Sequence, residues 1–148
     1  MKINNVVVAG GGVLGSQIAF QAAYCGFNVT IWLRSEGSIG RCQPKLDHLK
    51  EAYIADIKKM ATPEGQTPST WCRGLADFDT FNPEECIKKV EDAYKNIKLE
   101  LDVKKAFGNA DLVIESMAEN VDEKILELAI DTYGKLEGET DSKKDRNF

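Results

Sequence analysis

The chain has 148 residues, of which 43% are hydrophobic and 29% are charged, and its formal net charge is -5. This length corresponds to one domain with a substantial core. The excess of acidic side chains argues against nucleic acid or an anionic membrane surface as the main partner. No apolar run approaches the ~20 residues that span a bilayer.

Four cysteines, Cys25, Cys42, Cys72 and Cys86, are widely and irregularly spaced. A metal or redox centre built on cysteine uses closer pairs such as C-x-x-C. The spacing therefore predicts reduced thiols in a cytoplasmic protein and no metal site.

The N-terminal part of the chain predicts a βαβ unit. Residues 3–9 form a short apolar run typical of a buried strand, and residues 13–25 predict a helix with small side chains on its inner face. Gly26 is placed to end that helix. Residues 27–33 are rich in β-forming side chains and predict a second buried strand. Such a unit of about 30 residues has the size of a mononucleotide-binding half.

Three glycines, Gly10, Gly12 and Gly15, lie between the first strand and the first helix in the spacing G-x-G-x-x-G. Glycine lets the backbone turn tightly and approach a pyrophosphate, which then binds the free N–H groups where the helix begins. Val13 and Leu14 stand at that helix start. In this βαβ context the motif predicts a dinucleotide site, and the alternative is a tight turn in an α/β protein that binds no dinucleotide.

The end of the second predicted strand bears on the choice of cofactor. Folds that bind NAD usually place Asp or Glu there, where the carboxylate accepts hydrogen bonds from the ribose. This chain has Leu33, which can neither bond the ribose nor repel a 2′-phosphate, followed by Arg34 and Ser35. Arg34 could hold such a phosphate through two hydrogen bonds, with Ser35 adding a hydroxyl. The sequence thus favours NADP, and the alternative is a surface role for Arg34.

The remaining sequence predicts further elements of an α/β domain. A long helix over 38–60 is followed by a loop over 61–82 that is rich in Pro and Gly. Asn82 is the predicted N-cap of a helix that ends near Lys95. The later expected elements are a strand over 97–101, a short helix over 103–108 capped by Asp102, a strand over 110–116 and a helix over 121–133.

Together these elements predict an α/β fold, a Rossmann-type parallel sheet with a long helical pair inserted between its second and third strands. In this interpretation residues 1–133 form the dinucleotide-binding domain. Residues 134–148 are polar and predict a solvated C-terminal tail.

The residues after the fourth predicted strand would border the nicotinamide end of the site. Glu119 and Lys124 could hydrogen-bond the carboxamide or the ribose there, or be a capping acid and an exposed helix lysine. Hydride transfer to or from a carbonyl also needs a general acid or base, most often His. The one histidine, His48, lies in the middle of the long predicted helix, so no catalytic residue is assigned.

Several of these segments resemble the N-terminal domain of 3-hydroxyacyl-CoA dehydrogenases. The segments that carry the resemblance are Val6–Ser16, Gln17–Ala19, Gly26–Val29 and Ala110–Glu115, together with Glu119. The resemblance covers about residues 1–133 and implies a Rossmann domain that binds NAD, joined to a helical C-terminal domain that dimerises. It implies oxidation of a 3-hydroxyacyl-CoA to the 3-ketoacyl-CoA. It also implies that the three glycines form the pyrophosphate loop and that Glu119 and Lys124 contact the cofactor.

Two departures from that family limit the expected function. Leu33 stands where the family has its ribose-binding aspartate, and the chain ends before the family's fifth strand, catalytic His–Glu pair and helical domain. The leading hypothesis is an NAD(P)-binding domain of a 3-hydroxyacyl-CoA (3-hydroxybutyryl-CoA) dehydrogenase-like oxidoreductase of fatty acid metabolism. This domain is expected to be cut short, inactive alone and able to meet acyl-CoA only with a second domain.

Two alternatives to that hypothesis remain open at this point. One is a non-catalytic nucleotide-binding or interaction module, and the other is a fragment of an NADP-dependent 3-hydroxyacid dehydrogenase. Under any of these hypotheses an open sheet without a covering domain leaves apolar surface exposed, so self-association is also expected.

Overall fold

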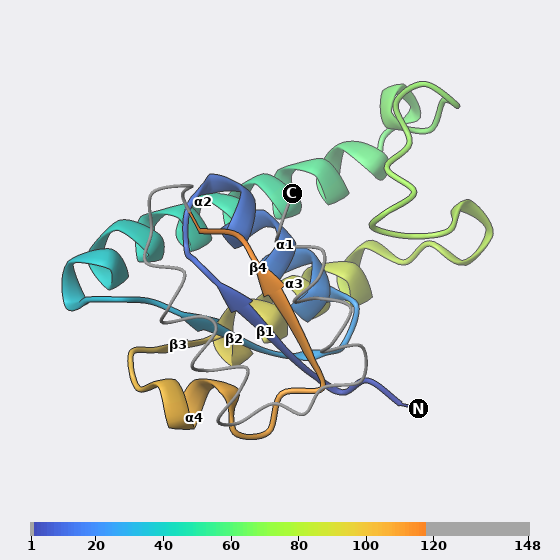
Figure 1. Ribbon diagram of the computed structural model, residues 1–148. Helices are drawn as coiled ribbons and strands as arrows, with labels where there is room; N and C mark the ends of the chain where they lie inside the picture. Colours follow the sequence, from blue (N-terminus) through green and yellow to red (C-terminus); the bar gives the residue numbers. More distant parts are fainter. Residues whose placement is uncertain (1, 118–148) are drawn as a thin grey trace, which may run out of the picture.

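Four short extended segments are separated by helical segments along residues 2–117, which are the residues that the computed structural model describes. They form the strands β1 (Asn5–Ala9), β2 (Asn28–Trp32), β3 (Lys98–Glu100) and β4 (Leu112–Glu115). All neighbouring strands pair in parallel, in the order β3-β2-β1-β4 (Figure 1). This is the predicted Rossmann-type sheet, and its four strands are confirmed with ends trimmed by one or two residues.

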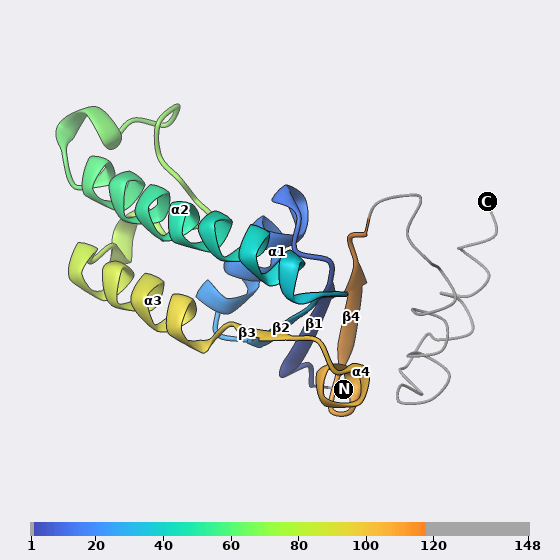
Figure 2. The same cartoon turned by 90° about the vertical axis from the view of Figure 1, so that its left-hand side faces the viewer.

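The helices cover the sheet unequally. The helices α1 (Val13–Tyr24), α2 (Glu36–Met60) and α3 (Pro83–Asn96) lie on one face, whereas the short α4 (Val103–Phe107) lies on the other (Figure 2). Since α2 and α3 both follow β2 and precede β3, the predicted helical pair between the second and third strands is confirmed.

Local capping sets where these helices begin and end. Asn82 and Asp102 each accept a hydrogen bond from the backbone N–H three residues ahead, so they cap α3 and α4 as predicted. At Gly26 the backbone turns to a φ of 101° and closes α1 with two hydrogen bonds back to its last turn. In contrast, α2 begins at Glu36, two residues before the predicted start, because the Ser35 hydroxyl caps it.

The larger hydrophobic core lies between the sheet and the three long helices. Side chains from β1, β2, α1, α2 and α3 interdigitate there, and the fully buried ones include Val8, Phe20, Ile31, Ile57 and Val90. Because successive strand side chains alternate between faces, Val7, Ala9 and Trp32 point to the opposite face and pack with α4. Both faces of the central strands are therefore buried, as parallel strands require.

The segment between α2 and α3 is a loop, as predicted, with two short 3-10 turns, η1 (Pro63–Gly65) and η2 (Phe78–Thr80). It is fastened to α1 by two side chains. The Tyr24 hydroxyl donates to the Leu75 carbonyl at 2.6 Å, and the Gln21 amide donates to the Gly74 carbonyl at 2.9 Å. These bonds hold the loop away from the carboxyl end of the sheet.

Several predictions concern residues that the structure does not describe. The helix over 121–133, the tail over 134–148, Glu119 and Lys124 lie outside the described residues. Among residues 2–117, no helix combines the length and the apolar character needed to cross a membrane. All four cysteines are free thiols.

Candidate functional site

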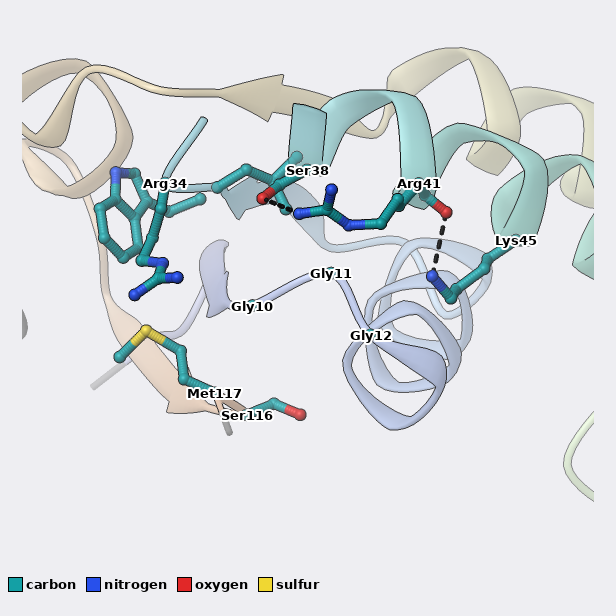
Figure 3. Close-up of a pocket in the computed structure, with 11 residues that line it drawn as sticks. Gly10, Gly11, Gly12, Arg34, Ser38, Arg41, Lys45, Ser116 and Met117 are labelled. Carbon is teal, nitrogen blue, oxygen red and sulfur yellow. Dashed lines mark hydrogen bonds between the residues drawn. The ribbon is translucent and has the colours of Figure 1, made fainter. Parts of the chain in front are cut away.

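The strand order creates a crevice at the carboxyl end of the sheet. From β1 the chain proceeds to β2 and β3 on one side, whereas β4 pairs with β1 on the other side. Ligands of parallel sheets bind at such a switch point, outside the carboxyl ends of the strands. A cavity of about 240 Å³ opens there, between the turns that follow β1, β2 and β4 and the start of α2 (Figure 3).

Two of the three predicted glycines are required by close packing within the first turn. Gly10 has a φ of 118°, and a Cβ on it would lie 2.5 Å from the carbonyl oxygen of Ser116. A Cβ on Gly15 would lie 2.2 Å from the carbonyl oxygen of Gly10. The first contact brings the turn against the end of β4, and the second brings α1 against the turn.

Gly12 differs from its neighbours because a Cβ on it would meet no atom within 4 Å. It is the N-cap residue of α1 in an extended conformation, and it offers no side chain to the N–H groups of the first turn. No acidic side chain stands in that turn, and Val13 and Leu14 are 66% and 63% exposed. The start of α1 is thus an uncapped, open helix N-terminus that suits an anion.

Two buried groups hold the glycine turn from behind. The Ser16 hydroxyl donates to the Gly11 carbonyl at 3.1 Å and lies 3.7 Å from the Cys42 sulfur. Burial raises the pKa of the Cys42 thiol, which keeps it protonated. A Cβ on Gly11 would lie 2.6 Å from the Leu33 Cδ2 and 2.8 Å from the Cys42 Sγ, so a larger residue there would have to displace these two side chains. This supporting pair comes from α1 and α2, and the sequence did not indicate it.

The wall that follows β2 begins with an apolar residue. Leu33 is 4% exposed and lines the cavity, so the position offers the ribose no hydrogen-bonding side chain. Arg34 is exposed and also lines the cavity. Ser35 is not among the lining residues, and its hydroxyl accepts the Ser38 N–H at 3.2 Å as the cap of α2. The structure therefore brings Arg34 to the cavity and gives Ser35 a structural partner.

Three further polar residues line this wall from the first turns of α2: Ser38, Arg41 and Lys45. They were not predicted from the sequence. Their spacing of three and four residues places them on one face of the helix. The Arg41 Nη2 donates to the Ser38 hydroxyl at 3.0 Å, and the Lys45 Nζ donates to the Arg41 carbonyl at 3.0 Å. That helical spacing, directly after a strand end, was the signal available in the sequence.

The third side of the cavity is the end of β4, where Ser116 and Met117 line it. Glu115 turns back and accepts the Met117 N–H at 2.6 Å. His48 is exposed in the middle of α2 and is not a lining residue, which confirms its placement on a solvated helix face. Within residues 2–117, no group of three His, Cys, Asp or Glu side chains is arranged to hold a metal ion.

Comparison with known proteins identifies the family. Residues 5–129 match the family model described as "3-hydroxyacyl-CoA dehydrogenase, NAD binding domain". The chain belongs to this family. A probable 3-hydroxyacyl-CoA dehydrogenase of Caenorhabditis elegans is 28% identical over 121 residues, which are 82% of this chain and 32% of that relative.

Solved structures share the fold of this chain. A diketoreductase described as acting on dicarbonyl compounds is 31% identical, with a TM-score of 0.58 over 84% of this chain and 35% of its own. The (S)-3-hydroxybutyryl-CoA dehydrogenase of Ralstonia eutropha has the same fold, at 22% identity and a TM-score of 0.56 over 86% of this chain and 35% of its own. The chain spans about a third of the length of these relatives.

The match confirms the resemblance found in the sequence. The chain is a NAD-binding domain of the 3-hydroxyacyl-CoA dehydrogenase family. This assignment favours the leading hypothesis over a fragment of an NADP-dependent 3-hydroxyacid dehydrogenase.

Proposed function

We propose that this domain holds a nicotinamide adenine dinucleotide with its pyrophosphate at the turn from Gly10 to Gly15. The observation that carries the proposal is the open N-terminus of α1, where Gly12 leaves the space in front of the uncapped N–H groups free. A pyrophosphate there accepts hydrogen bonds from backbone groups and is stabilised by the helix dipole. The bound cofactor would supply hydride transfer, and the turn would supply binding and orientation.

The family assignment supports NAD as the cofactor, and Arg34 adds a finer proposal. Arg34 reaches the cavity directly after the position at which Leu33 replaces a ribose-binding acid. A guanidinium can bind a phosphate through two hydrogen bonds, so we propose that this site also accepts NADP. Glu119 and Lys124 remain proposed contacts at the nicotinamide end.

At the level of a whole enzyme, we propose oxidation of a 3-hydroxyacyl-CoA, in which this chain supplies the cofactor domain. Within residues 2–117, His48 stands away from the cavity, and no His, Asp, Glu, Tyr or Cys side chain lines it. The domain boundaries at 1–133 and 134–148 belong to the same proposal. We expect no turnover of acetoacetyl-CoA by the 148-residue chain alone, and measurable turnover would contradict this.

Calorimetric titration of the 148-residue chain with NADH and NADPH tests the binding proposal. The informative variant is Gly12→Val, since its side chain enters open space in front of the α1 N–H groups and not the packed core. We expect affinity for both dinucleotides to fall about tenfold or more, because two or more charge-assisted hydrogen bonds are obstructed.

The matched control is Gly40→Val, the same change at an exposed position of α2 with no atom within 4 Å. It should leave both affinities unchanged. Binding of neither dinucleotide by the wild-type chain would overturn the proposal and favour a non-catalytic module. Unchanged affinity in Gly12→Val would overturn the assignment of the pyrophosphate to this turn.

Self-association and a cytoplasmic location remain predictions from the sequence. The exposed side chains of Val13, Leu14 and Phe27 are the large apolar groups on and beside α1 that could support an interface. Sedimentation at rising protein concentration tests this, and a monomer at all concentrations would contradict it.

A further inference from the structure

We infer that the cavity selects a dinucleotide whose adenosine ribose carries a phosphate, and that Arg41, oriented by Ser38, is a specificity-determining residue beside Arg34. This inference rests on the proposed function, because it takes the cavity to be the adenosine end of the dinucleotide site. It adds to that function a preference for the 2′-phosphorylated form over the unphosphorylated one, and a second guanidinium, that of Arg41, which the sequence did not indicate.

The charged side chains around the cavity are all positive. Three cationic side chains line it, those of Arg34, Arg41 and Lys45. Among the described residues no Asp or Glu lines it, and the one salt bridge joins Lys88 to Asp92 on α3. This concentration of positive charge stands out in a chain of net charge -5. A ribose hydroxyl group offers such a cluster only neutral acceptor atoms, whereas a phosphate dianion accepts charge-assisted hydrogen bonds from several cations.

The Arg41 side chain is held in place before any ligand binds. Its Nη2 donates to the Ser38 hydroxyl at 3.0 Å, and that hydroxyl lies 3.1 Å from the Ser35 hydroxyl. A guanidinium has five N–H donors, so one bond to Ser38 orients the group and leaves other donors for an anion. Because the side chain is already held, binding costs less conformational entropy than it would for a free arginine.

The two arginines reach the cavity from two different elements of the fold. Arg34 comes from the turn after β2, and Arg41 comes from α2, with Ser38 between them (Figure 3). Opposite them lies the glycine turn, from Gly10 to Gly12. A ligand whose pyrophosphate occupies that turn would extend its adenosine ribose toward the wall after β2, which is where this fold binds the ribose.

The residue directly after β2, Leu33, also favours a phosphorylated ribose. Leu33 is buried and apolar, so it gives the ribose 2′-hydroxyl no acceptor and places no negative charge against a 2′-phosphate. An unphosphorylated ribose therefore loses a hydrogen bond at this wall, and a phosphorylated ribose meets only cations and hydroxyl groups. Both effects favour binding of the phosphorylated ribose.

The experiment is a calorimetric titration of the 148-residue chain with NADPH and NADH. We expect the wild-type chain to bind NADPH at least about tenfold more tightly than NADH. Arg41→Ala should weaken NADPH binding about tenfold and leave NADH binding unchanged. Ser38→Ala should shift the same ratio by a smaller factor, because it loosens the arginine without removing it. Arg41→Lys should restore part of the NADPH affinity, since it keeps the charge and loses the fork of donors.

The matched control is Lys58→Ala, which removes one positive charge from an exposed site at the far end of the same helix. It should leave the NADPH to NADH ratio unchanged. A second measurement avoids variants altogether: the wild-type chain should bind 2′,5′-ADP more tightly than 5′-AMP, which differs from it only by the 2′-phosphate. The preference should also shrink as salt is raised, because exposed charges are screened.

The outcomes separate the inference from the function on which it rests. Equal affinity for NADH and NADPH, or equal affinity for 2′,5′-ADP and 5′-AMP, would overturn the inference and leave the proposed function standing. An Arg41→Ala chain that loses both dinucleotides equally would overturn the specificity role of Arg41. Binding of none of these ligands by the folded wild-type chain would overturn the proposed function itself.

Discussion

The two walls of the cavity are built on opposite principles. The turn between β1 and α1, residues 10–15, is shaped by the absence of side chains, since Gly10 and Gly15 allow contacts that any Cβ would break. The wall after β2, residues 33–45, depends on the side chains that line it. The first wall suits a group common to all dinucleotides, and the second suits the group that distinguishes them. Arg34 and Arg41 on this wall are exposed and can change without disturbing the core, so we propose that cofactor specificity resides there.

The largest expected effect belongs to the packed glycine wall. Gly15→Ala places a Cβ 2.2 Å from the Gly10 carbonyl oxygen, so the turn and α1 must separate. We expect the free energy of unfolding to fall by about 3 kcal/mol, at the upper end of the cost of overpacking. Gly12→Ala, which adds a Cβ in open space, should cost about 1 kcal/mol or less. Urea unfolding of both variants checks this, and equal losses would show that Gly15 is not tightly packed.

The second largest expected effect comes from placing an acidic side chain on the wall after β2. Leu33→Asp should weaken NADPH binding about tenfold or more through repulsion of the phosphate. It should also lower the free energy of unfolding by about 1–3 kcal/mol, because the position is buried. Leu33→Asn is the control, since it shares the cost of burying a polar group and carries no charge. If both variants weakened NADPH equally, charge at this position would not govern the choice.

A smaller effect distinguishes support of the turn from selectivity. Ser16→Ala removes the hydrogen bond to the Gly11 carbonyl and should cost about 1 kcal/mol of stability. Because this bond holds the turn that both cofactors use, NADH and NADPH should weaken by the same factor. Ser38→Ala should act on NADPH alone. Titration of the two variants with both dinucleotides provides the measurement. A changed ratio of NADPH affinity to NADH affinity in Ser16→Ala would show that the glycine turn also contributes to selectivity, which contradicts the separate roles of the two walls.

The smallest effect lies at the opposite end of the sheet, where Asp111 joins β4 to β1. Its carboxylate accepts the backbone N–H groups of Asn5 at 2.8 Å and Asn4 at 2.9 Å, and these bonds lower the pKa of Asp111. A pKa that is lower in the folded chain gives stability above the unfolded value of about 3.9, and this stability is lost as the pH falls through the folded value.

Thermal unfolding of wild type and Asp111→Asn between neutral and acidic pH tests this linkage. The Tm difference between the two chains should be greatest near neutral pH and should shrink on acidification. Dinucleotide affinity at neutral pH should be the same for both chains, because Asp111 is far from the cavity along the strands. A Tm difference that does not depend on pH would contradict the role of the carboxylate.

The contrast between the walls also explains what the sequence could predict. Glycine spacing after an apolar strand specifies a backbone shape locally, so Gly10, Gly12 and Gly15 were identified without tertiary information. The second wall was predicted only as far as Arg34, the residue that follows the strand end directly. Arg41 and Lys45 reach the cavity because the first turns of α2 lie beside the glycine turn. That placement depends on how α2 packs against α1, which the neighbouring residues do not specify.

The supporting pair was hidden for a different reason. Ser16 and Cys42 are separated by 26 residues and meet only because α1 and α2 pack side by side. A lone buried thiol carries no local signal of its partner. The strands, the inserted helical pair and the caps at Gly26, Asn82 and Asp102, in contrast, follow from neighbouring residues, and their predicted positions agree with the structure to within two residues. The Ser35 cap of α2 was not predicted.

The central claim is that one dinucleotide contacts both walls, and amide-resolved NMR titration of the 148-residue chain with NADPH tests it most directly. We predict that the backbone N–H signals of Val13, Leu14 and Gly15 and the guanidinium Nε–H signals of Arg34 and Arg41 shift together, with one common Kd. Shifts at only one of the two walls, or shifts at both walls with different Kd values, would contradict the account.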